Sequence, residues 1–258
     1  MRILLTNDDG IFAPGLKALA ACFSGAGHTV YVCAPDRERS AASHSATFTR
    51  GLHAAPMDVD HAAQAWAVDG TPADCASLGL FLCREKGVEL VVSGINLGMN
   101  QGGACVYSGT VAAAMEGAMR GVQALAVSLC VRPADGEING DCDFTAAARA
   151  ALRVAEWMPA HPLPRGAIYN LNVPPLPYEQ LRGIRPARLA PVFLETPSYV
   201  LLADEQGPCY RFANAAPRQM DDPQWDTCLT DRGYVSLTKL TWDLRLNEDD
   251  SELGKIIL

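Results

Sequence analysis

Two adjacent carboxylates, Asp8 and Asp9, are the first residues of the chain whose types suggest chemistry. They follow residues 2–6, RILLT, an apolar run that predicts a buried strand. Neighbouring strand side chains point to opposite faces, so the two carboxylates can converge only if the chain turns, which Gly10 permits. Two ionised carboxylates held together repel each other and require a cation. Asn, Asp and Gly are also ordinary turn residues, so the motif alone leaves a simple turn open.

Polar side chains also follow two later predicted strands. Ser40 lies in the polar loop after strand 28–35, and Asn96 ends strand 88–96. Ligands of open α/β sheets bind beyond the carboxyl ends of the strands, so these groups are expected to meet the carboxylates. Carboxylate, hydroxyl and amide oxygens suit Mg²⁺ or Mn²⁺, and no His adjoins the carboxylates to favour zinc. The predicted metal ligands are Asp8, Asp9, Ser40 and Asn96.

The start of a predicted helix over residues 110–120 suits a phosphate group. Free backbone N–H groups and the positive end of the helix dipole attract anions there, and Ser108 and Thr110 add hydroxyl donors. A plain helix cap remains the alternative. The residues expected to bind substrate or phosphate are Ser43, Asn100, Ser108, Gly109 and Thr110.

The elements that must position these residues alternate along the first part of the chain. The predicted strands are 2–6, 28–35, 65–70, 88–96 and 124–131, and the predicted helices are 14–23, 72–83, 110–120 and 144–158. Thr71 is expected to cap the second helix, with Pro72 at its first position. This alternation predicts an α/β fold with right-handed crossovers and a mainly parallel sheet covered on both faces.

After residue 160 the composition changes. Prolines cluster and helical periodicity fades, while residues 167–173, 198–204 and 233–244 have the character of strands. We therefore expect residues 1–160 to form the α/β core and residues 161–258 to form a β-rich extension.

Composition limits the classes of function. The 258 residues fit one large domain, and the net charge of -8 argues against a sequence-independent nucleic-acid binder. No run approaches the roughly 18 apolar residues that cross a bilayer. MRILLT ends at once in NDDG without developing a leader, and the nine cysteines contain no CxxC pair. We expect buried thiols and a cytoplasmic location, with no membrane partner.

These motifs together resemble the SurE family of stationary-phase survival proteins, which act as nucleoside-monophosphate phosphatases. The resembling segments are ILLTNDDGIFAPGLKAL, APDRERSAASHS, DGTPADCASLGL, VVSGINLGMNQGGACVYSGTVAAAMEGAMRG, ALAVSL, YNLNVP and GYVSLTKLTWDL. They span most of the chain. The combination of NDDG with SGINxGxN and YSGTVxAAMEG is highly specific to that family.

The resemblance implies a Rossmann-like three-layer αβα core whose C-terminal part exchanges a β-hairpin or arm between subunits. It implies one divalent metal ion per subunit at the four positions named above, and assembly as a homodimer or homotetramer. It implies hydrolysis of nucleoside 5′- and 3′-monophosphates, with a range extending to other phosphate esters or short polyphosphate. Residues 191–228, which match no family pattern closely, are expected to include the exchanged arm.

The expected mechanism is direct hydrolysis, with Asp8, Asp9 and Asn96 as catalytic residues. The metal would lower the pKa of a bound water, and one aspartate would orient or deprotonate that water. An aspartyl-phosphate route is an alternative, although such enzymes usually carry a second Asp where this chain has Gly10. A nucleotide-binding regulatory module without turnover is another alternative. A dinucleotide oxidoreductase is disfavoured because no GxGxxG follows the first strand.

Overall fold

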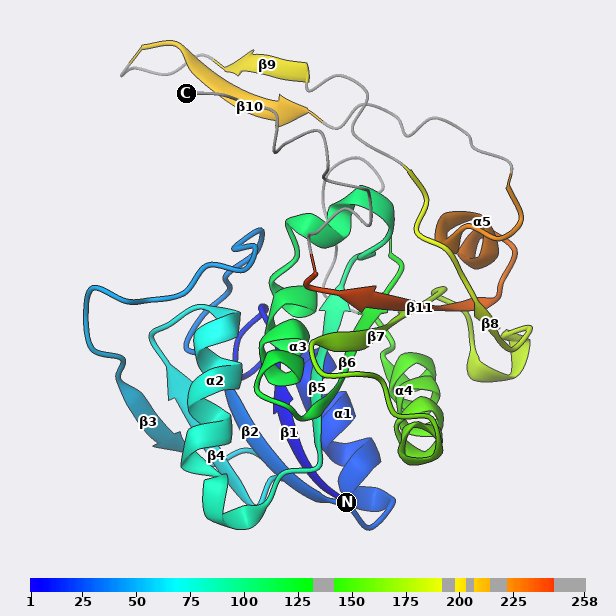
Figure 1. Ribbon diagram of the computed structural model, residues 1–258. Coiled ribbons are helices and arrows are strands. Elements are labelled where there is room, and N and C mark those ends of the chain that lie inside the picture. Colours follow the sequence, from blue (N-terminus) through cyan, green and yellow to red (C-terminus); the bar gives the residue numbers. More distant parts are fainter. Residues whose placement is uncertain (132–141, 192–197, 203–206, 214–221, 244–258) are drawn as a thin grey trace, which may run out of the picture.

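The molecule is built around one large sheet. The structure, a computed structural model, describes residues 1–131, 142–191, 198–202, 207–213 and 222–243. The strands of the sheet are β1 (Arg2–Thr6), β2 (Thr29–Pro35), β3 (Ala54–Met57), β4 (Gln64–Val68), β5 (Leu90–Leu97), β6 (Gln123–Leu129), β7 (Ala167–Val173), β8 (Ile184–Pro186) and β11 (Val235–Thr241). They lie in the order β3-β4-β2-β1-β5-β6-β7-β11-β8 (Figure 1).

The central strands of this sheet are parallel. All neighbouring pairs from β4 to β7 run in the same direction, whereas β3 is antiparallel to β4 and β11 is antiparallel to β7. The carboxyl ends of the parallel strands therefore share one edge, the upper edge in Figure 1. This edge carries the loops in which the candidate site residues occur.

Helices cover both faces of the sheet. Helices α1 (Pro14–Gly25) and α4 (Thr145–Trp157) pack on one face, and α2 (Pro72–Leu82) and α3 (Gly109–Met119) pack on the other (Figure 1). Within β1, Ile3 and Leu5 belong to the first core and Leu4 to the second, as the two-residue period of a strand requires. The predicted Rossmann-like αβα core is confirmed.

Two of these helices begin with side-chain caps. At the start of α2 the hydroxyl of Thr71 accepts from the backbone N–H of Asp74, and the Asp74 carboxylate accepts from the N–H of Thr71. This reciprocal capping box, followed by Pro72, confirms the predicted helix start. At the start of α3 the Ser108 hydroxyl accepts from the N–H of Val111.

The C-terminal part adds strands to the same sheet. β7, β11 and β8 all come from beyond residue 160, and the short helix α5 (Asp226–Asp231) packs beside them. The sheet therefore runs across residue 160. The division into a core and an extension at that residue stays a prediction. β3, β8, β10 and α5 were not predicted from the sequence.

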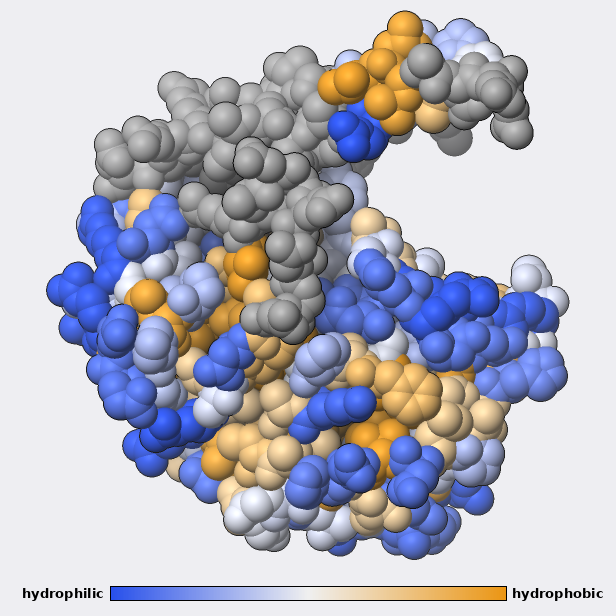
Figure 2. Space-filling view, turned by 180° about the vertical axis from the view of Figure 1, so that it is seen from behind, coloured by the Kyte–Doolittle hydropathy of each residue, from blue (hydrophilic) through white to orange (hydrophobic). Residues whose placement is uncertain are grey.

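A separate hairpin completes the β-rich extension. β9 (Ser198–Leu202) and β10 (Cys209–Ala213) pair antiparallel and stand clear of the main sheet in Figure 1. Val200 is 44% exposed and Leu201 is 61% exposed, and hydrophobic side chains gather on this hairpin in Figure 2. The hairpin lies within the residues expected to include the exchanged arm. Exchange itself stays a prediction.

None of the helices in the described ranges has the length and apolar composition needed to cross a bilayer.

Candidate functional site

The turn that carries the two aspartates is held by Asn7. Its side-chain amide nitrogen donates to the Gly10 carbonyl at 2.9 Å, and its amide oxygen accepts from the Gly10 N–H at 3.2 Å. Asn7 is fully buried, and Gly10 has a φ of +102°, which residues with a Cβ rarely adopt. The chain therefore turns sharply at the end of β1, as the convergence of Asp8 and Asp9 requires.

Asp8 lies against the first residues of α3. Thr110 Oγ1 donates to Asp8 Oδ1 at 2.6 Å, and the backbone of Thr110 also hydrogen-bonds to this carboxylate. A Cβ on Gly109 would lie only 2.9 Å from the Asp8 side chain, so a glycine is needed for this approach. The helix start predicted to hold a phosphate thus already faces one carboxylate. The hydroxyl of Ser108 is engaged as the cap of α3.

Asp9 is joined to the end of β5. Its carboxylate hydrogen-bonds to the backbone of Leu97, the residue that follows Asn96. The Asn96 amide nitrogen donates to the Gly98 carbonyl at 2.9 Å. The amide oxygen of Asn96 is therefore the atom that can serve as a ligand.

A bulge in β5 sets the direction of Asn96. The register with β6 shifts between Ser93 and Asn96, and the Gly94–Ile95 peptide bond is cis. A Cβ on Gly15 of α1 would lie 2.2 Å from the Ile95 carbonyl oxygen. Bulges redirect the side chains that follow them, and this one depends on the small residue in the facing helix.

Ser40 reaches the same region through a loop that we call the serine loop, residues 36–47. The Arg39 N–H donates to the backbone carbonyl of Asp8 at 2.7 Å, which attaches the loop to the aspartate turn. The exposed Ser40 hydroxyl donates to the carboxylate of Glu38 at 2.6 Å. Glu38 was not singled out by the sequence, because nothing in the motif marks it as facing the aspartates.

Two predicted substrate-binding residues act as anchors in this structure. Ser43 Oγ donates to the Val106 carbonyl at 2.8 Å. The buried Asn100 donates from its amide nitrogen to Ser128 Oγ at 2.8 Å, and its backbone is held by Asn172. These bonds hold the serine loop against the segment before Ser108 and hold the loop after β5 against β6 and β7. Direct contact of Ser43 and Asn100 with a substrate stays a prediction.

The surroundings of Asp8 and Asp9 disfavour the ionised form of both carboxylates. Burial raises the pKa of Asp8, and hydrogen bonds from Thr110 only partly offset it. Burial first, and then the charges of Asp8 and Glu38, raise the pKa of Asp9 to about 7. Within the described ranges, the ion pairs between side chains do not join either carboxylate to a basic residue.

This donor set fits a divalent cation. Crowded carboxylates whose pKa values are raised gain from a positive charge, and the available atoms are hard oxygens. Among the described residues, no three His, Cys, Asp or Glu side chains group closely enough to hold a metal by themselves. A ligand set at this edge must therefore include neutral oxygens, for which Ser40 and Asn96 are the predicted residues.

Known proteins resemble this chain over nearly its whole length. The sequence model described as "Survival protein SurE" matches residues 3–195. The chain belongs to the SurE family. SurE relatives named "5′-nucleotidase SurE" include one from Gloeobacter violaceus, 39% identical over 98% of this chain and 95% of its own. One from Aeromonas hydrophila is 38% identical over 98% of this chain and 97% of its own.

The fold of this SurE chain also matches a solved structure. A crystal structure of SurE protein from Aquifex aeolicus aligns with a TM-score of 0.82 and 34% identity, covering 98% of both chains. The family match to residues 3–195 includes every candidate site residue, from Asp8 to Thr110. Family membership, which the resemblance implied, is confirmed.

Proposed function

We propose that this SurE chain is a phosphoric monoester hydrolase that cleaves nucleoside 5′-monophosphates to nucleoside and phosphate. The observation that carries the proposal is the arrangement of Asp8 and Asp9, two crowded carboxylates between the end of β1 and the start of α3. The relatives' name, 5′-nucleotidase, supports the substrate class. Activity on 3′-monophosphates and on short polyphosphate belongs to the same proposal.

One divalent ion, Mg²⁺ or Mn²⁺, is the proposed cofactor. Asp8, Asp9, Ser40 Oγ and the amide oxygen of Asn96 would hold it. When bound, such an ion polarises a phosphoryl oxygen and lowers the pKa of a coordinated water. The raised pKa values of both aspartates support this assignment, because a cation would relieve their repulsion.

The two aspartates have different proposed roles. Asp8 is buried and bonded to Thr110, so it serves as a fixed ligand. Asp9 is less buried and hydrogen-bonds to the backbone of Leu97, so it is the carboxylate that can orient the attacking water and accept its proton. The water oxygen bonds to phosphorus as the ester P–O bond breaks, and the proton that Asp9 takes from this water passes to the leaving nucleoside oxygen.

The start of α3 is the proposed seat of the phosphate. The backbone N–H groups near Gly109 and the Ser108 hydroxyl would stabilise the charge that develops on the phosphoryl oxygens in the transition state. The Thr110 hydroxyl, which donates to Asp8 in this structure, would contact the phosphate only by giving up that bond. Gly109 permits close approach because it lacks a Cβ. We further propose a homodimer or homotetramer working in the cytoplasm, with the exposed β9–β10 hairpin as a subunit contact.

Phosphate release from a panel of nucleoside 5′- and 3′-monophosphates tests the proposal. The protein is assayed after chelation and after Mg²⁺ or Mn²⁺ is restored, beside folded Asp8→Asn and Asp9→Asn variants. We expect activity to vanish with chelator, to return with metal and to be absent in both variants. Full activity in the chelated protein or in either variant would contradict the metal site. Metal-independent nucleotide binding without phosphate release would favour a regulatory module.

A further inference from the structure

The serine loop adopts a backbone conformation that needs support from outside. Ala41 has a φ of 56° and Ser43 has a φ of 52°, values in the left-handed region that residues with a Cβ rarely adopt. Such residues persist where surrounding contacts hold them. The serine loop contains no helix or strand, so the contacts that hold it must come from neighbouring elements.

The far end of the serine loop is bound to the start of α2. The Thr47 N–H donates to Asp74 Oδ1 at 2.9 Å, and Thr47 Oγ1 donates to Asp74 Oδ2 at 2.6 Å. Beside them, Thr71 Oγ1 donates to the Ser45 carbonyl at 2.7 Å. These hydrogen bonds together connect the last residues of the serine loop to Thr71 and Asp74.

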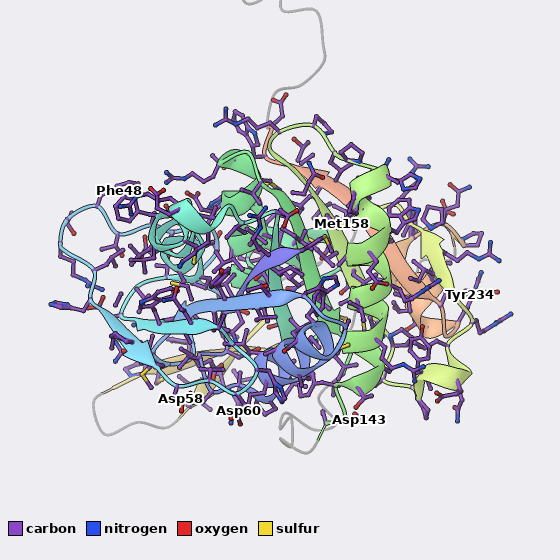
Figure 3. All side chains as sticks on the ribbon, turned by 90° about the horizontal axis from the view of Figure 1, so that it is seen from below. Phe48, Asp58, Asp60, Asp143, Met158 and Tyr234 are labelled. Atoms are coloured by element: carbon purple, nitrogen blue, oxygen red, sulfur yellow. The ribbon has the colours of Figure 1, made fainter. Side chains whose placement is uncertain are left out.

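Apolar packing does not hold this end of the serine loop in place of the hydrogen bonds. Phe48, the next residue along the chain, is 91% exposed and points away from the sheet in Figure 3. The Asp74 side chain, in contrast, is buried within the first turn of α2, and a Cβ on Gly70 would lie 2.8 Å from it. At this end of the loop, a buried polar residue provides the support that a hydrophobic side chain would otherwise give.

Asp74 makes more bonds than helix capping requires. The capping box uses the N–H of Thr71 and the N–H of Asp74, whereas both bonds from Thr47 are additional. Burial alone would raise the pKa of Asp74, but the hydrogen bonds from Thr47 and Thr71 outweigh burial and lower it. The carboxylate is therefore ionised at neutral pH and makes strong, charge-assisted bonds.

We propose that Asp74 is a positioning residue that holds the serine loop, and with it Ser40 and Ser43, beside the aspartates. The inference rests on the proposed function, because Ser40 is a proposed metal ligand. Arg39 attaches the near end of the loop to the Asp8 carbonyl, and Ser43 attaches its middle to the segment before α3. Asp74 supplies a further attachment through Thr47, beside the contacts of Ser45 with Thr71 and of His44 with Glu116. Releasing it loosens the end of the loop that follows the strained segment containing Ser43.

The experiment uses Thr47, so that the α2 cap stays intact. Thr47→Val removes the hydroxyl donor at similar volume, Thr47→Ser keeps it, and Thr49→Val, two residues further along the chain, is the matched control. Asp74→Asn is the second variant. Each full-length protein is examined by hydrogen–deuterium exchange of peptides from residues 36–47, by Mn²⁺ binding and by nucleotidase kinetics.

For Thr47→Val we expect exchange in the serine loop to rise about 10-fold, as the loss of a charge-assisted hydrogen bond implies. The Mn²⁺ dissociation constant and KM should rise several-fold, while kcat at saturating metal and substrate stays within about two-fold of the wild type. Thr47→Ser should restore all three quantities, and Thr49→Val should change none. Asp74→Asn should show the same pattern as Thr47→Val.

Unchanged exchange in the serine loop of Thr47→Val would overturn the proposal. A fall in kcat with unchanged KM and Mn²⁺ binding would also overturn it, because mispositioned ligands act first on binding. If the wild type hydrolyses no nucleotide, the proposed function fails by itself. Exchange and Mn²⁺ binding would then still decide whether Asp74 positions the loop.

Discussion

Thr110 Oγ1 lies 2.6 Å from Oδ1 of Asp8, which joins the loop after β1 to the first turn of α3. Both residues are buried, and the pKa of Asp8 is raised by its burial and only partly lowered by this bond. The hydroxyl therefore orients a carboxylate that has little access to water. An outer hydrogen bond of this kind fixes which carboxylate oxygen remains available as a ligand.

Thr110→Val tests this bond, since valine keeps the shape and loses the donor. We expect Mn²⁺ affinity to fall about 10- to 100-fold, as it does when partners of metal ligands are removed. Isothermal titration calorimetry measures the change, and Thr110→Ser serves as the control that keeps the hydroxyl. Equal Mn²⁺ affinity in Thr110→Val and wild type would show that Asp8 is not held this way.

Gly109→Ala should disturb the site through a steric clash. Its Cβ would lie 2.9 Å from the Asp8 side chain and 3.0 Å from Pro72, so one of them must move. We expect the free energy of unfolding to fall by about 1–3 kcal/mol, although Ala favours a helix over Gly. Gly25→Ala in α1 is the control, because its added Cβ meets no atom within 4 Å. Urea unfolding that shows both variants equally stable would refute the close approach.

The lowered pKa of Asp74 predicts that the free energy of unfolding depends on pH. Its pKa in the folded protein is below the ordinary value of 3.8, because hydrogen bonds from Thr47 and Thr71 outweigh burial. The unfolded chain then binds the proton more readily, so the contribution of Asp74 is complete above about pH 4 and is lost as the pH falls through the lowered pKa. The difference in unfolding free energy between wild type and Asp74→Asn should therefore shrink as the pH falls from about 5 to about 3.

Exposed Asp60→Asn is the control for that measurement, and chemical denaturation at each pH gives the free energies. A difference between wild type and Asp74→Asn that stays constant, or grows as the pH falls, would contradict the assignment of these bonds to an ionised Asp74.

Asp226 should hold the loop that follows β5, through the backbone of Gly102. Its buried carboxylate accepts from the Gly102 N–H at 2.9 Å and from the Ala190 N–H at 3.0 Å. In Asp226→Asn an amide nitrogen would face one of these donors, leaving it without an acceptor, at a cost of about 1–3 kcal/mol. Thermal and urea unfolding should show the loss, and exposed Asp58→Asn should not. An Asp226→Asn variant as stable as the wild type would contradict this role.

The sequence predicted the core of the fold because its signals are local. Periodicity placed β1, β2, β5 and all four long helices, and the Thr71 cap was visible as a residue type before Pro72. The short elements β3, β8, β10 and α5 escaped prediction, because three to six residues carry too little periodicity. The pairing of β3 and β8 depends on the neighbouring strands that the finished sheet provides.

The candidate site was predictable only as a list of residue types. Asp8, Asp9 and Thr110 could be named from their places at strand and helix ends, but the bond between Asp8 and Thr110 spans 102 positions. The bulge after Ser93 could not be foreseen either, because it depends on Gly15 of a distant helix. Spacing along the chain does not report contacts of this kind.

β1 lies between β2 and β5 in the sheet, although β2, β3, β4 and two helices separate β1 from β5 along the chain. The aspartate turn is therefore complete only after β5 has docked on β1 and brought Leu97 to Asp9. Pairings between distant segments form slowly, because a long loop must close first. During refolding, the rate of Mn²⁺ uptake at the proposed site would thus report how fast β5 docks on β1. A nascent chain that ends before Leu90 would carry both aspartates and remain unable to bind the ion.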